Sequence, residues 1–212
     1  MSTYQHLTVF GATRGTGVHV VRQALSQDLD VNAVARRPSD VLLSDPRLVV
    51  HEGDLLRPSS LGKPIAEADA VVFLAGPSRG GPATLYSEGG GNVIAAMRDA
   101  GVRRVVAVTA ALVDQPNDTF FQRQTRRVVR SFFKQVQADR LVFEGLLRSS
   151  GLDWTVVRPP QLTDKPARGS YRTALDTGVR GGVKLSRADL AHAILTVLDD
   201  HRTFGRTVDV AY

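Results

Sequence analysis

The sequence contains no cysteine among its 212 residues. This absence excludes disulfide bonds, thiolate nucleophiles and metal sites built on cysteine. Aromatic residues make up only 6% of the chain, and no apolar run approaches the roughly 20 residues that a membrane-spanning helix needs. The first residues show no basic stretch followed by an apolar one, so we expect no signal peptide. Together these absences favour a protein of the cytoplasm.

The charge of the chain is moderately basic, with 27 lysines and arginines against 21 acidic residues and a net charge of +6. Such a balance suits either nucleic acid or a small anionic ligand such as a dinucleotide. No nucleic-acid recognition motif accompanies the arginines, so a small anionic ligand is the better prediction. The spacing of the five histidines suggests no metal site.

The most informative stretch is Leu7–Val20, which reads LTVFGATRGTGVHV. A short apolar strand runs into three glycines, and a helical pattern follows. Gly11 would allow a sharp turn, Gly15 would let a pyrophosphate approach the backbone, and Gly17 would let the helix pack closely on its strand. The helix N-terminus would then offer unpaired N–H groups to the anion. This context predicts a dinucleotide site; the alternative is a purely structural turn.

The end of the second predicted strand is basic, because Arg36 and Arg37 follow directly after it. An acidic residue at about this distance from the glycines would bind the ribose hydroxyls of NAD. Two arginines can instead bind a 2′-phosphate through charge-assisted hydrogen bonds, and Arg14 in the glycine loop can add a third positive charge. We therefore predict NADPH or NADP as the preferred cofactor. The alternative is that both arginines are simply solvated.

Strand and helix patterns alternate along the whole chain. This alternation predicts an α/β fold, a single Rossmann-like domain over residues 1–212 with a doubly wound parallel sheet and helices on both faces. The expected strands are 7–10, 31–35, 47–51, 70–75, 104–110, 153–158 and 207–210, the last of them at the sheet edge. A further short strand is an option at 170–174. The expected helices are 15–28, 59–67, 86–99, 120–136, 139–150 and 187–198, the last opened by a Ser186–Asp189 capping box.

Two features of the helices leave alternatives open. Glycines 89–91 fall inside a predicted helix, so either that helix begins at Asn92 or close packing requires the bare backbone. Helix 120–136 is amphipathic and basic, which suits a membrane surface, nucleic acid, an anionic substrate or a merely solvated face packed over the active site or a dimer partner. In the next helix, Leu141, Val142, Leu146 and Leu147 are expected to point inward.

The loop phrase GAT at 11–13 and the stretch SSGLDWTVVRPPQL at 149–162 resemble the atypical short-chain dehydrogenases/reductases of the NmrA-like NAD(P)-binding family. Arg14 stands where that family has its second glycine. Matches at 87–97 and 169–171 and at Thr109 make the biliverdin-IXβ reductase/flavin reductase group the most similar branch. The resemblance implies that NADPH is bound and that hydride passes to flavins or linear tetrapyrroles. It also implies that Asp54 accepts from the adenine amino group. The alternative is that Asp54 only caps the next turn, and the two roles can coexist.

The chain departs from this family pattern at the catalytic positions. It has no Tyr-x-x-x-Lys, the pair that supplies the proton in the catalytic-tyrosine branch. Ala110 replaces a serine of the similar group, Gln161 replaces a histidine, and Arg140 replaces another, which disfavours tetrapyrroles. A flavin accepts hydride at N5 and can take its second proton from water, so proximity and orientation are sufficient. Thr109, Gln161 and Tyr86 are therefore assigned positioning roles.

The predicted cofactor site gathers the loops that follow the strands, because ligands bind outside the carboxyl ends of the strands in open α/β sheets. Its residues are Gly11, Thr13, Arg14, Gly15, Thr16, Gly17, Arg36, Arg37, Asp54, Leu55, Leu74, Ala75, Gly76, Thr109, Ala110, Pro159, Pro160 and Gln161. The substrate side is expected mainly from 76–91, 111–140 and 159–185.

Three functions fit this sequence. The first is an NADPH-dependent oxidoreductase that transfers hydride to a flavin, quinone or similar conjugated acceptor, acting as a monomer or homodimer. The second is a non-catalytic NADP-binding regulator or redox sensor of the NmrA-like type, which the missing catalytic residues suit. The third is an isomerase, epimerase or biosynthetic tailoring enzyme that uses the same cofactor.

Overall fold

The structure is a computed structural model that describes residues 3–76, 82–109 and 120–212, with the backbone alone for 120–133. Within these residues, eight strands form one sheet in the order β3-β2-β1-β4-β5-β6-β10-β8. Its strands are β1 (His6–Phe10), β2 (Asp30–Ala35), β3 (Leu48–Glu52), β4 (Ala70–Phe73), β5 (Arg104–Val108), β6 (Asp153–Arg158), β8 (Arg172–Leu175) and β10 (Arg206–Ala211). A small second sheet pairs β7 (Gln161–Thr163) with β9 (Lys184–Ser186).

The neighbouring strands of the large sheet are parallel from β3 to β10, as predicted, and the α/β Rossmann-like fold is confirmed. The expectation that 207–210 forms the sheet edge is wrong. Strand β8 pairs antiparallel on the outer side of β10, with Leu175 opposite Val208. Because β8 is short and mostly exposed, it lacks the apolar run that marks a central strand.

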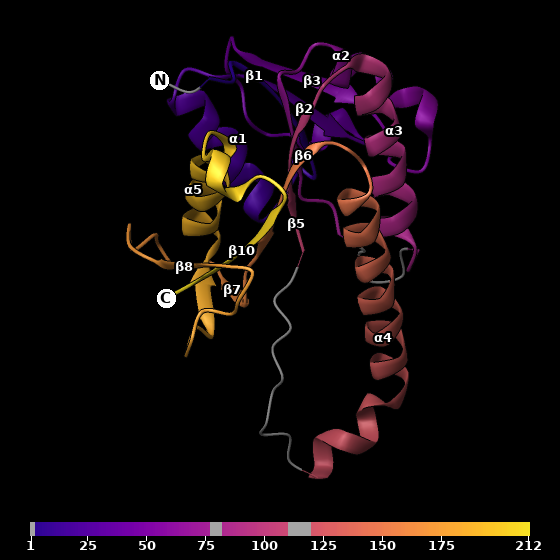
Figure 1. Cartoon of the computed structure of the whole chain (residues 1–212), viewed down its shortest axis with the longest axis vertical. Helices are drawn as coiled ribbons and strands as arrows, with labels where there is room; N and C mark the ends of the chain where they lie inside the picture. The colour runs from indigo at the N-terminus through magenta and orange to yellow at the C-terminus, as the bar shows by residue number, and fades with distance from the viewer. Residues whose placement is uncertain (1–2, 77–81, 110–119) are drawn as a thin grey trace.

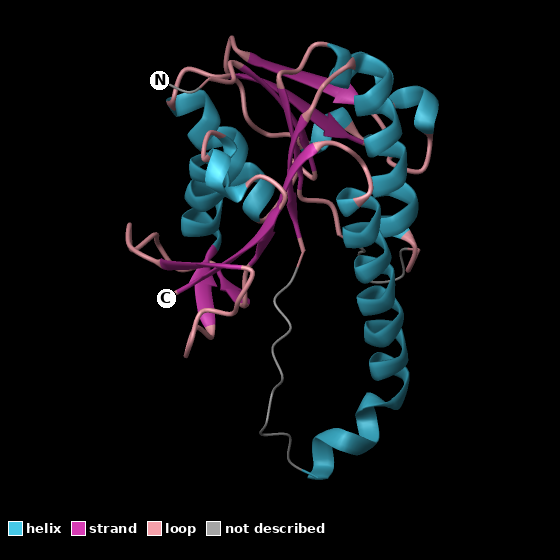
Figure 2. Cartoon of the chain, viewed as in Figure 1, coloured by secondary structure: helices cyan, strands magenta, loops and turns pink. Residues whose placement is uncertain are grey.

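Helices cover both faces of the sheet, which Figure 1 shows nearly edge-on. Helices α1 (Thr16–Ser26) and α5 (Arg187–Leu198) share one apolar core with the sheet. Helices α2 (Gly62–Ala66), α3 (Gly90–Ala100) and α4 (Phe120–Arg148) lie over the other face. Figure 2 shows the strands as a layer between these two groups. Short helical turns occur at Pro38–Asp40, Pro58–Ser60 and His201–Thr203, and a π-helical turn at Leu85–Gly89.

Helix α4 corrects two predictions. The two helices expected at 120–136 and 139–150 form one helix of 29 residues, because no glycine or proline separates them. Leu141, Val142 and Leu146 are 52%, 55% and 37% exposed, whereas Leu147 is buried. No helix in the described part of the chain has the length and apolar character needed to cross a membrane.

The inward face of α4 carries charged side chains, which explains the wrong assignment. Arg140, Phe143, Glu144 and Leu147 are each at most 4% exposed. These positions follow the i, i+3, i+4, i+7 spacing of one helix face. Apolar periodicity alone predicts that Arg140 and Glu144 face solvent, and it therefore assigns the wrong face of α4 to the core. The side chains of 120–133, including most of the predicted basic face, lie outside the described residues.

The three glycines at 89–91 are explained by close packing. A Cβ atom placed on Gly90 would lie 2.3 Å from Cε2 of Phe143, and one on Gly89 would lie 2.9 Å from Cβ of Leu55. Helix α3 begins at Gly90 rather than at Asn92. The second of the two sequence alternatives is therefore the one observed: the bare backbone brings α3 against α4.

The predicted N-cap at the start of α5 is confirmed, but the reciprocal half of the capping box is not, because the Ser186 N–H donates to the Tyr212 hydroxyl at 3.2 Å. The Ser186 hydroxyl accepts from the Asp189 N–H at 3.0 Å. The buried Asp189 carboxylate accepts from the N–H groups of Arg168 and Gly169 at 2.8 and 3.0 Å. It also accepts from the hydroxyls of Ser186 and Tyr212. Asp189 thus joins the start of α5, the preceding loop and the C-terminal strand.

Replacing Asp189 by asparagine should lower the free energy of unfolding by about 2 kcal/mol at neutral pH, because the amide nitrogen would face hydrogen-bond donors. Burial raises the pKa of Asp189, but hydrogen bonds from Tyr212, Arg168, Ser186 and Gly169 outweigh it and hold the pKa below its usual value. The stabilisation is therefore complete above about pH 4 and is lost as the pH falls through the folded-state pKa. Chemical denaturation should show the difference between wild type and variant shrinking below about pH 4; a constant difference would contradict this account.

Candidate functional site

A cavity of about 650 Å³ opens at the carboxyl ends of β1, β2, β3 and β4. This is the edge at which open α/β sheets bind their ligands. Many of the residues predicted from the sequence to bind a cofactor lie on its wall. They are Gly11, Thr13, Arg14, Arg36, Arg37, Asp54, Leu55, Leu74, Ala75 and Gly76.

The glycine loop is packed so tightly that side chains would not fit. A Cβ atom on Gly17 would lie 1.9 Å from the carbonyl oxygen of Gly11, and one on Gly11 would lie 3.0 Å from the Ala75 nitrogen. Gly11 and Gly15 have φ values of +89° and +56°, which disfavour any residue with a Cβ. Gly15 is the N-cap of α1 and provides no side-chain cap. The Gly17 N–H donates to the Arg14 carbonyl at 3.2 Å, so an anion would meet the other N–H groups of the first turn of α1.

The two arginines after β2 have different surroundings. Arg37 is held by Asp40, whose Oδ2 lies 3.1 Å from Nε and 3.0 Å from Nη2 of the guanidinium. Arg36 lines the main cavity and also an adjoining hollow of about 350 Å³, together with Asp54 and Arg57. The sequence pattern does not distinguish the two arginines, because it does not show that the Asp40 carboxylate pairs with Arg37. Arg37 thus has a carboxylate partner, whereas Arg36 lines both hollows.

Asp54 fulfils the structural role that the sequence left open. Its Oδ1 accepts from the Leu56 N–H at 3.0 Å, and its own N–H donates to the Ser60 hydroxyl at 3.0 Å. These bonds hold the turn that follows β3. The carboxylate keeps further acceptor capacity, so its predicted role at the adenine edge stays a prediction alongside the structural one.

Tyr86 lies near the cavity wall, on the π-helical turn. Asp139 on α4 fixes this turn by accepting from the Tyr86 N–H at 2.8 Å. A Cβ atom placed on Gly76 would lie 3.0 Å from the Tyr86 hydroxyl, so this hydroxyl sits beside the segment that follows β4. Burial raises the pKa of Tyr86, against the lowering effect of Arg140. Tyr86 is therefore protonated at neutral pH.

Thr109 follows β5 and is 5% exposed. Its hydroxyl donates to Oε1 of Glu144 at 3.0 Å, and the Glu144 carboxylate also pairs with Arg158 and Arg148. Because its proton is directed at Glu144, Thr109 offers a ligand an acceptor rather than a donor. Glu144 was not predicted from the sequence. The signal that could have indicated it is a glutamate on the same helix face as the apolar residues Phe143 and Leu147.

The remaining predicted residues lie outside the observed wall. Thr16 follows the glycine loop in the first turn of α1. Pro159 is buried and Pro160 half-buried after β6, while Gln161 is exposed in β7. Gly15, Gly17, Thr109 and these residues are not among the cavity-lining residues of the described chain. Ala110 lies outside the described residues, as do 77–81 and 111–119 of the predicted substrate side.

Sequence comparison identifies related proteins. The chain is 29% identical over 167 residues to the UPF0659 protein C216.03 of Schizosaccharomyces pombe, covering 72% of this chain and 66% of that protein. It is 28% identical over 157 residues to the uncharacterised sugar epimerase YhfK of Bacillus subtilis, covering 72% and 67%. The chain thus spans about two thirds of the length of these relatives.

Solved structures share the fold. A short-chain dehydrogenase/reductase from Veillonella parvula in complex with NADP has a TM-score of 0.80 at 19% identity, with 99% of this chain and 95% of that chain covered. The anaerobillin reductase ChuY from Escherichia coli O157:H7 has a TM-score of 0.78 at 21% identity, with 97% and 96% covered. Residues 11–201 match the profile described as NAD(P)H-binding. With its glycine loop and cavity at the expected edge of the sheet, this chain belongs to the NAD(P)H-binding family.

Proposed function

We propose that this protein is an NADPH-dependent reductase that passes hydride to a flavin, quinone or similar conjugated small molecule. The observation that carries the proposal is the cavity that joins the glycine loop, Arg36 and the segment after β4. In this arrangement the N-terminus of α1 binds the pyrophosphate and Arg36 binds the 2′-phosphate. Bound NADPH would supply the hydride. The absence of cysteine supports the cytoplasm as the compartment.

The residues near Gly76 and β5 support orientation rather than proton donation. Thr109 offers an acceptor, because its proton is directed at Glu144. Burial raises the pKa of Tyr86, which makes its hydroxyl a weaker acid than that of an ordinary tyrosine. The substrate side is proposed to come from residues 76–91, 111–140 and 159–185. A site of this kind suits an acceptor that needs proximity and can take a proton from water.

A second candidate is an NADP-binding regulator or redox sensor. The hydrogen bond from Thr109 to Glu144 favours it, because it removes one polar proton from the predicted reaction site. An epimerase is a third, lesser candidate that the name of the Bacillus subtilis relative suggests. All three share the cofactor site and differ in the chemistry that the bound cofactor undergoes.

The test of the proposal combines turnover with binding. NADPH oxidation is followed by absorbance with FMN, riboflavin and several quinones, and NADP⁺ and NAD⁺ are titrated by calorimetry. Turnover with tighter binding of NADP⁺ is the expected result. Tight NADP⁺ binding without any turnover would favour the sensor, and interconversion of a sugar without net NADPH use would favour the epimerase.

Replacing Arg36 by glutamate should weaken NADPH binding by about 30-fold or more, because a charge-assisted contact to the 2′-phosphate becomes a repulsion. NADH binding should change by no more than about twofold, since NADH has no phosphate at this position. Arg37→Glu is the matched control: the Asp40 carboxylate already pairs with Arg37, so its effect should be smaller. Equal losses for NADPH and NADH in Arg36→Glu would contradict the assignment.

A further inference from the structure

A cation from the distant part of the chain lies against the glycine loop. Arg187 is the first residue of α5, and a Cβ atom placed on Gly15 would lie 3.3 Å from its Nε and 3.6 Å from its Cδ. Gly15 is the N-cap of α1. The guanidinium group therefore stands beside the helix N-terminus that offers N–H groups and a positive dipole end to an anion.

The packing of α1 against α5 sets this position. The two helices lie side by side on one face of the sheet (Figure 1), and their shared core contains Val20, Ala24, Leu190 and Ile194. The Gln23 amide on α1 donates to the Ala188 carbonyl in the first turn of α5 at 2.9 Å. The start of α5 is further fixed by the hydrogen bonds of Asp189. Arg187 therefore lies at a helix start that several hydrogen bonds and the shared core hold in place.

Arg187 forms an ion pair with Asp164, with 2.7 Å between Nη1 and Oδ1. The Asp164 side chain is 86% exposed, whereas that of Arg187 is 27% exposed. Such an exposed carboxylate is well hydrated and binds its partner weakly. A pyrophosphate at the N-terminus of α1 carries more negative charge and accepts bidentate hydrogen bonds from a guanidinium. It would therefore compete successfully for Arg187.

We propose that Arg187 is a pyrophosphate-binding residue of the dinucleotide site, and that it leaves Asp164 for the phosphates when the cofactor binds. The inference rests on the proposed function, because it requires a dinucleotide in the cavity. The inference adds a third source of positive charge to the site, besides the glycine loop and the arginines that follow β2. Since NADP and NAD share the pyrophosphate, Arg187 strengthens the binding of both to the same extent, unlike Arg36.

The test uses Arg187→Gln in the full chain, with calorimetric titration of NADP⁺ and NAD⁺ and a thermal unfolding curve. We expect both affinities to fall by about tenfold, the loss of one charge-assisted contact. The matched control is Arg202→Gln, which removes an exposed arginine paired with Asp200 beyond the opposite end of α5. This control should leave both affinities unchanged.

Asp164→Asn provides a second, independent test that does not alter the arginine. Removing the competing carboxylate should tighten both cofactors by about threefold. Unchanged affinities in Arg187→Gln, a loss confined to NADP⁺, or weaker binding by Asp164→Asn would each overturn the inference. A wild-type protein that binds neither dinucleotide would overturn the proposed function and this inference together, whereas the other outcomes leave the proposed function intact.

Discussion

Replacing Gly17 by alanine should weaken dinucleotide binding by about a hundredfold or more, or roughly 3 kcal/mol. The new Cβ would lie 1.9 Å from the carbonyl oxygen of Gly11 and 3.0 Å from Cα of Ala12. Both are backbone atoms, so no side-chain rotation can relieve the overlap. The loop must move away from α1, which displaces the N–H groups that would bind the pyrophosphate. Calorimetric titration with NADP⁺ measures the loss.

Gly145→Ala is the matched control, because nothing lies within 4 Å of a Cβ at this position in α4. Alanine in a helix interior should raise the free energy of unfolding by about 0.5–1 kcal/mol and leave NADP⁺ binding unchanged. A thermal unfolding curve of Gly17→Ala shows how much of its defect is local. Wild-type affinity in Gly17→Ala would mean that the loop does not hold the pyrophosphate.

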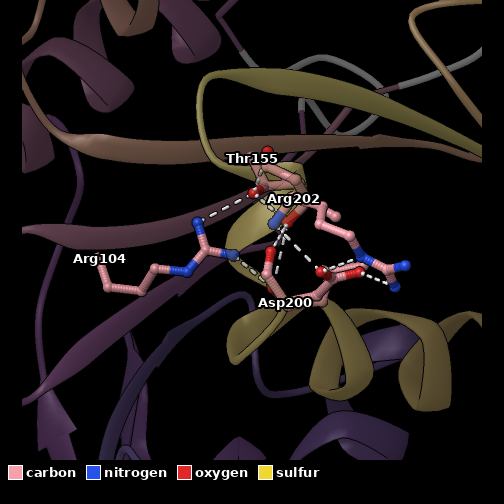
Figure 3. Close-up of polar contacts among 6 residues, drawn as sticks. Arg104, Thr155, Asp200 and Arg202 are labelled. Carbon is pink, nitrogen blue, oxygen red and sulfur yellow. Dashed lines mark hydrogen bonds and ion pairs between the residues drawn. The ribbon is translucent and has the colours of Figure 1, made fainter.

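The second large effect is expected at Arg104, the first residue of β5. Replacing Arg104 by leucine should lower the free energy of unfolding by about 3–4 kcal/mol. The guanidinium is buried and donates to the carbonyls of Val197 and Leu198 at the end of α5. It also donates to the Thr155 hydroxyl at 2.9 Å, as Figure 3 shows. Without it, the Leu198 carbonyl and the Thr155 hydroxyl lose a donor that leucine cannot replace. The Val197 carbonyl keeps only the longer bond of 3.3 Å from the Thr203 hydroxyl.

Arg104 keeps its charge under physiological conditions, although burial lowers its pKa to about 10. Its Cζ atom also lies 4.2 Å from the ring centre of Phe204, which adds a cation–π contact. Arg202, in the same view of Figure 3, pairs with Asp200 at the surface and is 85% exposed. Arg202→Gln should therefore change stability by less than about 1 kcal/mol. Chemical denaturation distinguishes the two variants, and equal effects would disprove the role assigned to the buried guanidinium.

Local patterns were sufficient to predict most of the elements and the edge of the sheet at which the cavity opens. The glycines of the loop 11–17 and the alternation of strand and helix depend on nearby residues, and the structure contains both. The N-cap at Ser186 is equally local. The buried face of α4 is not determined locally. Glu144 on this helix is paired with Thr109 after β5 and with Arg158 in β6, which are distant in sequence.

The sequence by itself determined the parallel α/β fold, the family and the loop where a pyrophosphate would bind. Turn chemistry and apolar periodicity depend on residues that are close in sequence, so the sequence alone is sufficient to predict them. Only the tertiary structure decided that Asp40 holds Arg37, that β8 forms the sheet edge and that Arg187 lies beside Gly15. The contacts at the sheet edge and at Arg187 join segments far apart in the chain. The Asp40 pair is local, but the orientation of its side chains depends on how the turn packs.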